Sequence, residues 1–234
     1  MTLEIERDGF ALSVGVLDDR TIHALMGALS EVAAGAGVRQ RESVYAIRSL
    51  LDAVPDAAAL ARSPAVRALV EPFLGPGCFA VRGILFDKTP DANWNVTWHQ
   101  DLSIAVRDRR DVPGFGPWSE KAGVVHVQPP AAILERMLTV RLHLDDCDAG
   151  NGPLQVLPGT HRGGRLSAGE IQQKRQDSPA TICPVPAGGA LLMRPLLLHA
   201  SSASQSPRHR RVIHLEYAAD ALPGGLSWKW ALTR

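Results

Sequence analysis

The sequence contains few cysteines, almost no net charge and no long apolar segment. Its three cysteines, Cys78, Cys147 and Cys183, are widely spaced and form no CxxC pair, which argues against a disulfide framework or a zinc ribbon. Three free thiols are typical of a reducing cytoplasm, where we expect the protein. The 25 basic and 24 acidic residues leave a formal charge of +1, so we predict no nucleic-acid partner. The most apolar late stretch, 190–198, is short and contains an arginine, so we expect no membrane span.

The length and composition are those of one globular domain. Of the 234 residues, 45% are apolar and 21% are charged, and we interpret 1–234 as a single domain. Residues 1–76 are predicted to be largely helical, because apolar residues recur at helical spacing between Ile22 and Leu29. Residues 44–54 are a second helical candidate. Ser63 is a favoured helix cap and is followed by a proline suited to the first turn.

Residues 77–219 change in character to short strands separated by glycine and proline turns. Within 137–145, apolar residues alternate with a second set formed by Thr139, Arg141, His143 and Asp145. Several short strands of this kind predict a sandwich or a jelly roll. Residues 102–130 interrupt the pattern with charges, prolines and glycines, and we interpret them as a lid insertion.

His99, Asp101 and His199 are candidate metal ligands. Residues two apart in a strand point to the same face, so His99 and Asp101 can direct an imidazole and a carboxylate to one point. His199 follows an apolar strand and offers a third ligand. Two histidines and one carboxylate leave three positions of an octahedron open, which suits a non-haem Fe(II) that also binds a chelating co-substrate and dioxygen. The HxD pattern alone is weak, because an ordinary hydrogen-bonded histidine beside a turn acid has the same spacing.

A second group of residues follows His199. A dicarboxylate co-substrate needs a fixed cation for its distal carboxylate, and a guanidinium matches it in a planar, bidentate way. Arg210 can provide the guanidinium, and Ser201 can add a hydroxyl. The alternative interpretation of residues 208–211 is a solvated basic edge, which is the commoner role of such a cluster.

Four motifs in the right order make the chain resemble the phytanoyl-CoA dioxygenase family. They are WHQD at 98–101, NGPLQVLPGTH at 151–161, LLMRPLLLHASS at 191–202 and RRVIHLEYA at 210–218. The resemblance implies a mainly β fold, namely a double-stranded β-helix (jelly roll, cupin-like) with N-terminal and flanking α-helices. It also implies Fe(II) as the metal, with 2-oxoglutarate and dioxygen as co-substrates.

The resemblance assigns roles to individual residues. His99, Asp101 and His199 match the iron ligands of the family. Arg210 matches the arginine that binds the distal carboxylate of 2-oxoglutarate, with Arg211 as the alternative if the register slips by one. Ser201 matches a hydroxyl beside the same carboxylate, and Gln100 matches a residue near the co-substrate.

Arg141 departs from the family pattern. Relatives carry an aromatic residue there, in the co-substrate pocket, and by alternation Arg141 shares its face with His143 and Asp145. Buried ionisable groups need partners, so we expect pairing within the protein or with a ligand. One hypothesis is that Arg141 contacts 2-oxoglutarate or an anionic substrate; the other is a structural salt bridge with Glu216 or Asp145.

The implied reaction is hydroxylation of a small-molecule substrate with release of succinate and carbon dioxide. Candidate substrate contacts are Trp118, His126 and His143, and the identity of the substrate stays open. Two alternatives belong to other classes. One is a non-catalytic jelly-roll module that binds metal as a sensor. The other is a zinc-dependent enzyme on the same scaffold, since two histidines and a carboxylate also suit zinc.

Overall fold

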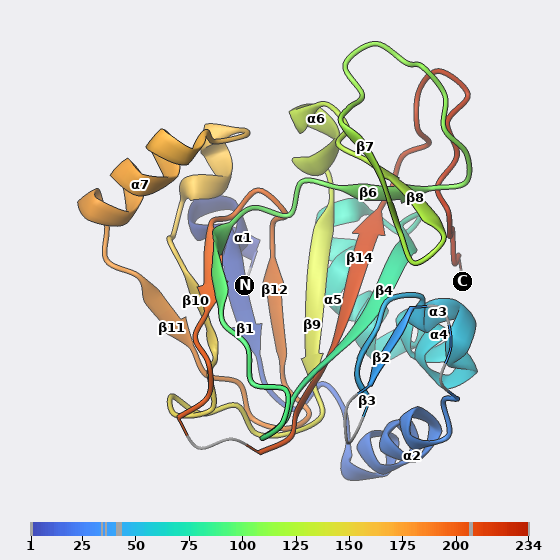
Figure 1. Cartoon of the computed structure of the whole chain (residues 1–234), viewed down its shortest axis with the longest axis vertical. Helices are drawn as coiled ribbons and strands as arrows, with labels where there is room; N and C mark the ends of the chain where they lie inside the picture. The colour runs from blue at the N-terminus through green and yellow to red at the C-terminus, as the bar shows by residue number, and fades with distance from the viewer. Residues whose placement is uncertain (1, 34, 36, 41–43, 206–207, 234) are drawn as a thin grey trace.

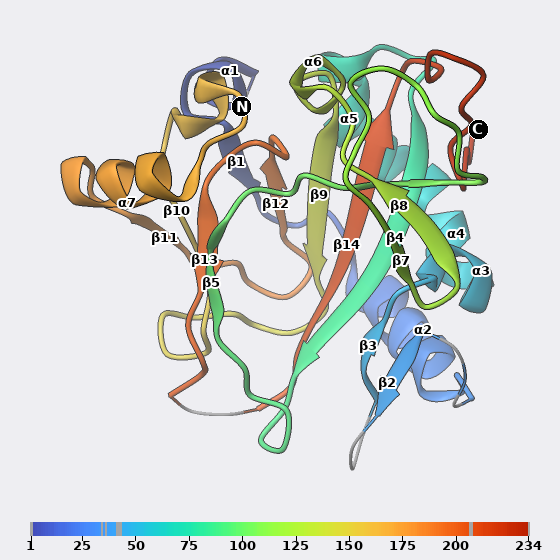
Figure 2. The same ribbon diagram turned by 45° about the horizontal axis from the view of Figure 1, so that its top comes forward.

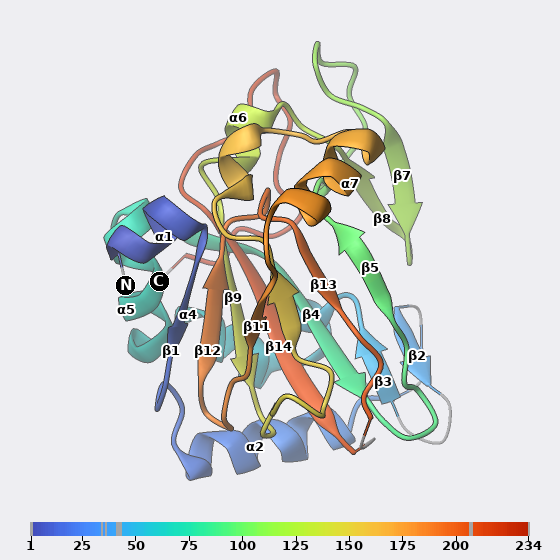
Figure 3. The same cartoon turned by 90° about the vertical axis from the view of Figure 1, so that its left-hand side faces the viewer.

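Two facing β-sheets form the centre of the molecule (Figure 1). The computed structural model describes residues 2–33, 35, 37–40, 44–205 and 208–233. The seven-stranded antiparallel sheet contains, in spatial order, β1 (Phe10–Ser13), β12 (Ala190–Met193), β9 (Leu138–His143), β14 (Arg210–Ala218), β4 (Phe79–Lys88), β3 (Val44–Ile47) and β2 (Val38–Gln40). The four-stranded sheet contains β11 (Thr181–Cys183), β10 (Leu154–Val156), β13 (His199–Ser201) and β5 (Val96–His99). Figure 3 shows the small sheet in front of the large one, the arrangement of a double-stranded β-helix.

The helices lie mainly on the outer face of the large sheet and at its ends. Their bounds are α1 (Thr2–Asp8), α2 (Asp19–Ser30), α3 (Leu50–Ala53), α4 (Pro55–Arg62), α5 (Pro64–Leu74), α6 (Ala131–Leu134), the 3-10 turn η1 (Thr160–Gly163) and α7 (Ala168–Asp177). Helices α3, α4 and α5 contact β4 and β9 from behind in Figure 1. Gly83 on β4 permits this approach, because a Cβ there would lie 2.8 Å from Leu51 of α3. No described helix is long and apolar enough to cross a membrane.

Alternation along β9 and β14 separates an apolar core from a polar interior. Val140 and Leu142 of β9 and Ile213 and Leu215 of β14 are buried in the main apolar cluster beneath the helices. The residues between them face the small sheet, and His214 is paired in register with Arg141. The period-2 pattern predicted this division correctly, because one face of each strand is buried against helices.

Side chains cap two helices of the N-terminal part, and one predicted helix is wrong. Asp18 caps α2 by accepting a hydrogen bond from the Thr21 amide at 2.8 Å, and Ser63 caps α5. The predicted helix over 44–54 is wrong in its first half, where β3 forms instead. Because β3 pairs with β4 through Ala46 and Phe86, tertiary pairing overrides the local helical pattern.

The range 102–130 contains a small sheet of its own. It comprises β6 (Ile104–Val106), β8 (Val124–Val127) and β7 (Trp118–Lys121) in that spatial order. Figure 2 shows β7 and β8 in front of β4 and β14, at one end of the barrel formed by the two large sheets. Lys121 at the end of β7 and Gln128 just after β8 line the same interior cavity as the candidate metal ligands.

Candidate metal centre

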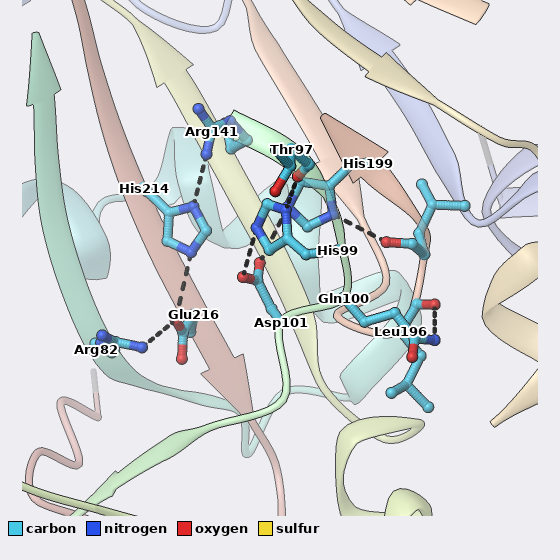
Figure 4. A network of polar contacts seen from close by, with 11 residues as sticks. Arg82, Thr97, His99, Gln100, Asp101, Arg141, Leu196, His199, His214 and Glu216 are labelled. Carbon is cyan, nitrogen blue, oxygen red and sulfur yellow. Dashed lines mark hydrogen bonds and ion pairs between the residues drawn. The ribbon is translucent and has the colours of Figure 1, made fainter. Parts of the chain in front are cut away.

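The three candidate ligands converge between the two sheets. His199 begins β13 and pairs in register with His99, the last residue of β5, so the two rings lie 4.2 Å apart between centroids. Asp101 follows two residues after β5, and its backbone amide is fixed to the Pro195 carbonyl at 2.9 Å. The His99 Nε2 lies 3.8 Å from one Asp101 oxygen, and the His199 Nε2 lies 3.7 Å from the other. Figure 4 shows all three side chains directed to one point.

Hydrogen bonds to backbone carbonyls define which nitrogen of each histidine is free. The His99 Nδ1 lies 2.8 Å from the Thr97 carbonyl, and the His199 Nδ1 lies 2.9 Å from the Leu197 carbonyl. A carbonyl can only accept, so each Nδ1 carries the proton and each Nε2 presents a lone pair to the common point. The Asp101 Oδ2 is buried without a hydrogen-bond partner in the described part of the chain. Three lone-pair donors facing one another call for a cation.

Burial and charge keep these groups in the forms that bind metal. Burial lowers the pKa of His199 to about 4, so its imidazole is neutral at pH 7. Burial alone would raise the pKa of Asp101, but the neighbouring histidines and Arg141 lower it to about 2. At neutral pH the Asp101 carboxylate and the neutral His199 imidazole therefore stand beside the free Nε2 of His99, a set that fits a divalent ion with open positions.

Arg210 and Ser201 lie in the same cavity as the triad, at the inner end of the barrel. The cavity has a volume of about 400 Å³. The Arg210 guanidinium donates to the Gly152 carbonyl, and its Nε has no partner among the described residues. Lys88, which pairs in register with Arg210, donates to the Ser201 hydroxyl at 3.2 Å and to the Ser202 carbonyl. Arg211 points away and forms an ion pair with Asp145 at 2.7 Å, so Arg210 is the arginine that faces the cavity.

A chain of hydrogen bonds runs along the large sheet opposite the triad (Figure 4). The Arg141 Nη1 donates to the His214 Nδ1 at 2.9 Å, which leaves the proton of neutral His214 on Nε2. That Nε2 lies 3.3 Å from the Glu216 carboxylate, which also accepts from Arg82 at 3.1 Å. Neither salt bridge considered for Arg141 is present, because Glu216 pairs with Arg82 and Asp145 with Arg211. Arg141 instead borders the cavity with a buried Nε that has no partner in the described chain.

Other predicted site residues lie elsewhere or have other partners. Gln100 borders the cavity, but its side chain already has partners. Its Nε2 donates to the Leu196 and Gly164 carbonyls, and its Oε1 accepts from the Leu166 backbone amide. The three candidate substrate contacts do not line the cavity: they are Trp118, His126 and His143. Trp118 lies beneath Arg109, and the two histidines are buried outside the cavity wall. Burial lowers the pKa of His126 to about 4 and that of His143 well below its ordinary value.

Three cations that line the cavity mouth were not predicted from the sequence. They are Arg48, just after β3, Arg82 on β4 and Lys121 at the end of β7. For Arg82 a signal existed: along β4, Arg82 shares the period-2 face of Phe86 and Lys88. Arg48 and Lys121 carry no such signal, because only the tertiary fold brings their segments together.

The fold and the site together define a double-stranded β-helix protein with two histidines and one carboxylate on one side of an open metal position. The chain belongs to the phytanoyl-CoA dioxygenase family, whose model matches residues 5–212. Curated relatives include the peroxisomal phytanoyl-CoA dioxygenase of Rattus norvegicus, 27% identical over 173 residues, and that of Mus musculus, 26% identical. These alignments cover 67% of this chain and 44% of each relative, so the chain spans less than half the length of these relatives.

Solved structures confirm the fold. AviO1 from Streptomyces viridochromogenes Tue57 is 23% identical with a TM-score of 0.66, and 94% of each chain is covered. EctD from S. alaskensis has a TM-score of 0.72 at 19% identity, covering 99% of this chain and 82% of EctD. SnoN, a non-heme alpha ketoglutarate dependent epimerase from nogalamycin biosynthesis, has a TM-score of 0.67 at 18% identity. The alignment covers 99% of this chain and 92% of SnoN. At these identities the likeness establishes the architecture alone.

Proposed function

We propose that the protein is an Fe(II)- and 2-oxoglutarate-dependent dioxygenase that hydroxylates a small molecule. His99, Asp101 and His199 would hold the iron, and Arg210 with Ser201 would hold the distal carboxylate of 2-oxoglutarate. Membership of the phytanoyl-CoA dioxygenase family supports the reaction class. EctD has been crystallised with iron and with 2-oxoglutarate, and SnoN with iron and alpha ketoglutarate, so the same fold accommodates this pair of ligands.

The convergence of unshared lone pairs carries the proposal. Two imidazole Nε2 atoms and an unpartnered Asp101 oxygen lie around one point, and all three ligand atoms are within 4.8 Å of one another. A structural hydrogen-bond cluster would place donors between such acceptors, and here both Nδ1 protons are already used by carbonyls. Leaving acceptors unpaired is costly unless a cation binds them.

Each residue has a defined task in this proposal. Bound iron, with 2-oxoglutarate and dioxygen, would supply the oxidising power and yield succinate and carbon dioxide as co-products. The Thr97 and Leu197 carbonyls hold the two imidazoles in the correct tautomer and orientation. Arg210 offers a guanidinium whose Nε is free for an incoming carboxylate, and Lys88 orients the Ser201 hydroxyl. Gln100 acts indirectly, by tying the segment around Leu196 to the loop at Gly164.

Two further predictions belong to this proposal. We treat 1–234 as a single oxygenase domain in which 1–76 supports the jelly-roll core at 77–219, and 102–130 covers the mouth. Lys121 supports the last point, since it lines the cavity from β7. A cytoplasmic location is supported by the three cysteines, all of which are free thiols.

The test compares the activity of the whole chain with Fe(II) and with Zn(II). Anaerobic protein with Fe(II) and 2-oxoglutarate should develop the metal-to-ligand charge-transfer absorption of a chelated 2-oxo acid, and admission of oxygen should release succinate. Asp101→Ala and His199→Ala should each weaken iron binding by more than about 100-fold, since loss of an outer-shell partner alone costs 10–100-fold. His23→Ala, on the exposed face of α2, is the matched control and should change nothing.

The alternatives make opposite predictions. A non-catalytic metal-binding module would bind Fe(II) yet show no absorption change with 2-oxoglutarate and no succinate. A zinc enzyme would be active with Zn(II) in the absence of oxygen. Either result would overturn the proposal.

A further inference from the structure

The cavity around the triad contains far more positive than negative charge. Its lining includes two carboxylates, Asp101 and Glu216. Five cationic side chains line the same space: Arg48, Arg82, Lys121, Arg141 and Arg210. Net charge of one sign in a concave, partly dry site raises the local concentration of ligands of the opposite sign.

The expected metal and co-substrate do not neutralise this charge. The argument here rests on the function proposed above. A divalent metal, Asp101 and a doubly charged 2-oxo acid together leave one negative charge, which Arg210 balances. Glu216 is used by Arg82 at 3.1 Å. Arg48, Lys121 and Arg141 therefore form no ion pair with any acid that the structure describes.

Strand register separates the cations into two groups. Arg210 pairs with Lys88 at one end of β4, and Glu216 pairs with Arg82 at the other. Six residues separate Lys88 from Arg82, which corresponds to roughly 20 Å along a strand. One five-carbon diacid cannot reach both ends. The triad lies between them, opposite the level of Arg141 and His214.

Arg48 and Lys121 come from separate elements and meet beside Arg82. Arg48 follows β3, whereas Lys121 ends β7 of the small outer sheet. Both are partly buried, and neither forms an ion pair with a described acid. Burial, Arg39 and Arg82 lower the pKa of Arg48. Burial, Arg82 and Arg48 lower the pKa of Lys121, and Glu216 and Asp101 offset this only in part. The group is therefore repulsive until an anion binds it.

We infer that the substrate carries an anionic group, a carboxylate or a phosphate, that binds between Arg48 and Lys121 at the mouth. Arg82 is held beside them by its ion pair with Glu216, and its remaining N–H groups can donate to the same anion. Ile84 and Phe86 of β4 line the same cavity between Arg82 and Lys88 and offer apolar surface to the body of the substrate. In this orientation the anion lies away from the metal and the apolar body extends toward the triad.

The experiment uses three probes that share a phenyl ring and carry different polar groups, two of them anionic and one neutral. Benzoate, phenyl phosphate and neutral benzamide are titrated into protein loaded with Mn(II) and 2-oxoglutarate, which mimics the loaded site without turnover. Paramagnetic relaxation of the ring protons reports binding near the metal. We expect benzoate or phenyl phosphate to bind and benzamide to bind at least tenfold more weakly. The tighter of the two anions identifies the carboxylate or the phosphate as the natural group.

Variants at the mouth decide whether the anion is where we place it. Arg48→Met and Lys121→Met should each weaken binding of the better anion by about tenfold, the loss expected for one charge-assisted hydrogen bond. Arg109→Met and Lys229→Met remove cations outside the cavity, stacked on Trp118 and Trp230, and should have no effect.

The possible failures are distinguishable. Equal binding of benzamide, or unchanged anion binding in both mouth variants, would overturn the anionic-substrate inference. Failure of the wild-type protein to bind Mn(II) with 2-oxoglutarate would instead count against the proposed function, and this is measured before any probe is added.

Discussion

The two ends of the barrel interior carry similar charge but hold it in different ways. At the inner end, Lys88 and Arg210 are 1% and 3% exposed and donate to backbone carbonyls and one hydroxyl. At the mouth, Arg82 is paired with an acid, while Arg48 and Lys121 are partly exposed. Neutral carbonyls orient the inner cations without cancelling their charge. The inner end is thus preorganised to bind one anion. At the mouth, substitution of a few partly exposed residues is enough to change the net charge.

The largest effect is expected from the single acid at the mouth. Glu216→Gln leaves the buried guanidinium of Arg82 without its counter-charge, so the free energy of unfolding should fall by about 3 kcal/mol. Urea denaturation measures this loss. Arg82→Met combined with Glu216→Leu should recover most of it, because two apolar side chains can replace a buried ion pair.

The same variant also tests the difference in net charge between the two ends. Glu216→Gln makes the mouth more positive, so phenyl phosphate should bind it more tightly than it binds the wild type. A variant as stable as the wild type would show that water, rather than Glu216, compensates Arg82.

Arg210→Met tests whether the two ends bind different ligands. It should raise the Michaelis constant for 2-oxoglutarate by about 100-fold, since a distal carboxylate would lose its bidentate partner in a buried site. Steady-state succinate release at varied 2-oxoglutarate measures this. Binding of phenyl phosphate at the mouth should change less than about twofold, because sites this far apart act independently. Equal losses of affinity for both ligands would show that the two ends do not bind separate ligands.

The sequence could predict the triad and Arg210 of the inner end because their signals are local or belong to known motifs. His99, Asp101, His199 and Arg210 lie in short segments whose strand alternation determines the face of each side chain. Alternation also placed Arg141 correctly on the polar face of β9. It could not show that Arg141 bonds His214, because that contact depends on the register between β9 and β14.

The mouth could not be predicted because its residues come from segments distant in the chain. Arg48 lies in a range predicted to be helical, where pairing with β4 creates β3. Lys121 lies in the range expected to be a lid, which contains a three-stranded sheet. The chemistry of Trp118 and His126 favours substrate contact, yet they lie on the same small sheet as Lys121 without lining the cavity. Residue type alone does not determine which side chain of an insertion turns inward.

The smallest expected effect tests how firmly the inner end holds its charge. Burial and Arg210 lower the pKa of Lys88 to about 7, against about 10.4 in an unfolded chain. Between these values the unfolded chain keeps a proton that the folded protein has released, so stability rises with pH. From pH 7 to 9 the wild type should gain about 1–2 kcal/mol relative to Lys88→Met in urea denaturation. The control is Lys229→Met, at an outer position, and its free energy of unfolding should change with pH as that of the wild type does. In the proposed site, bound 2-oxoglutarate would place a carboxylate beside Arg210, and this negative charge would raise the pKa of Lys88 and flatten the difference. If the free energies of unfolding of the wild type and Lys88→Met changed in parallel with pH in the absence of ligand, the positive charge of the inner end would be as well compensated as that of the mouth.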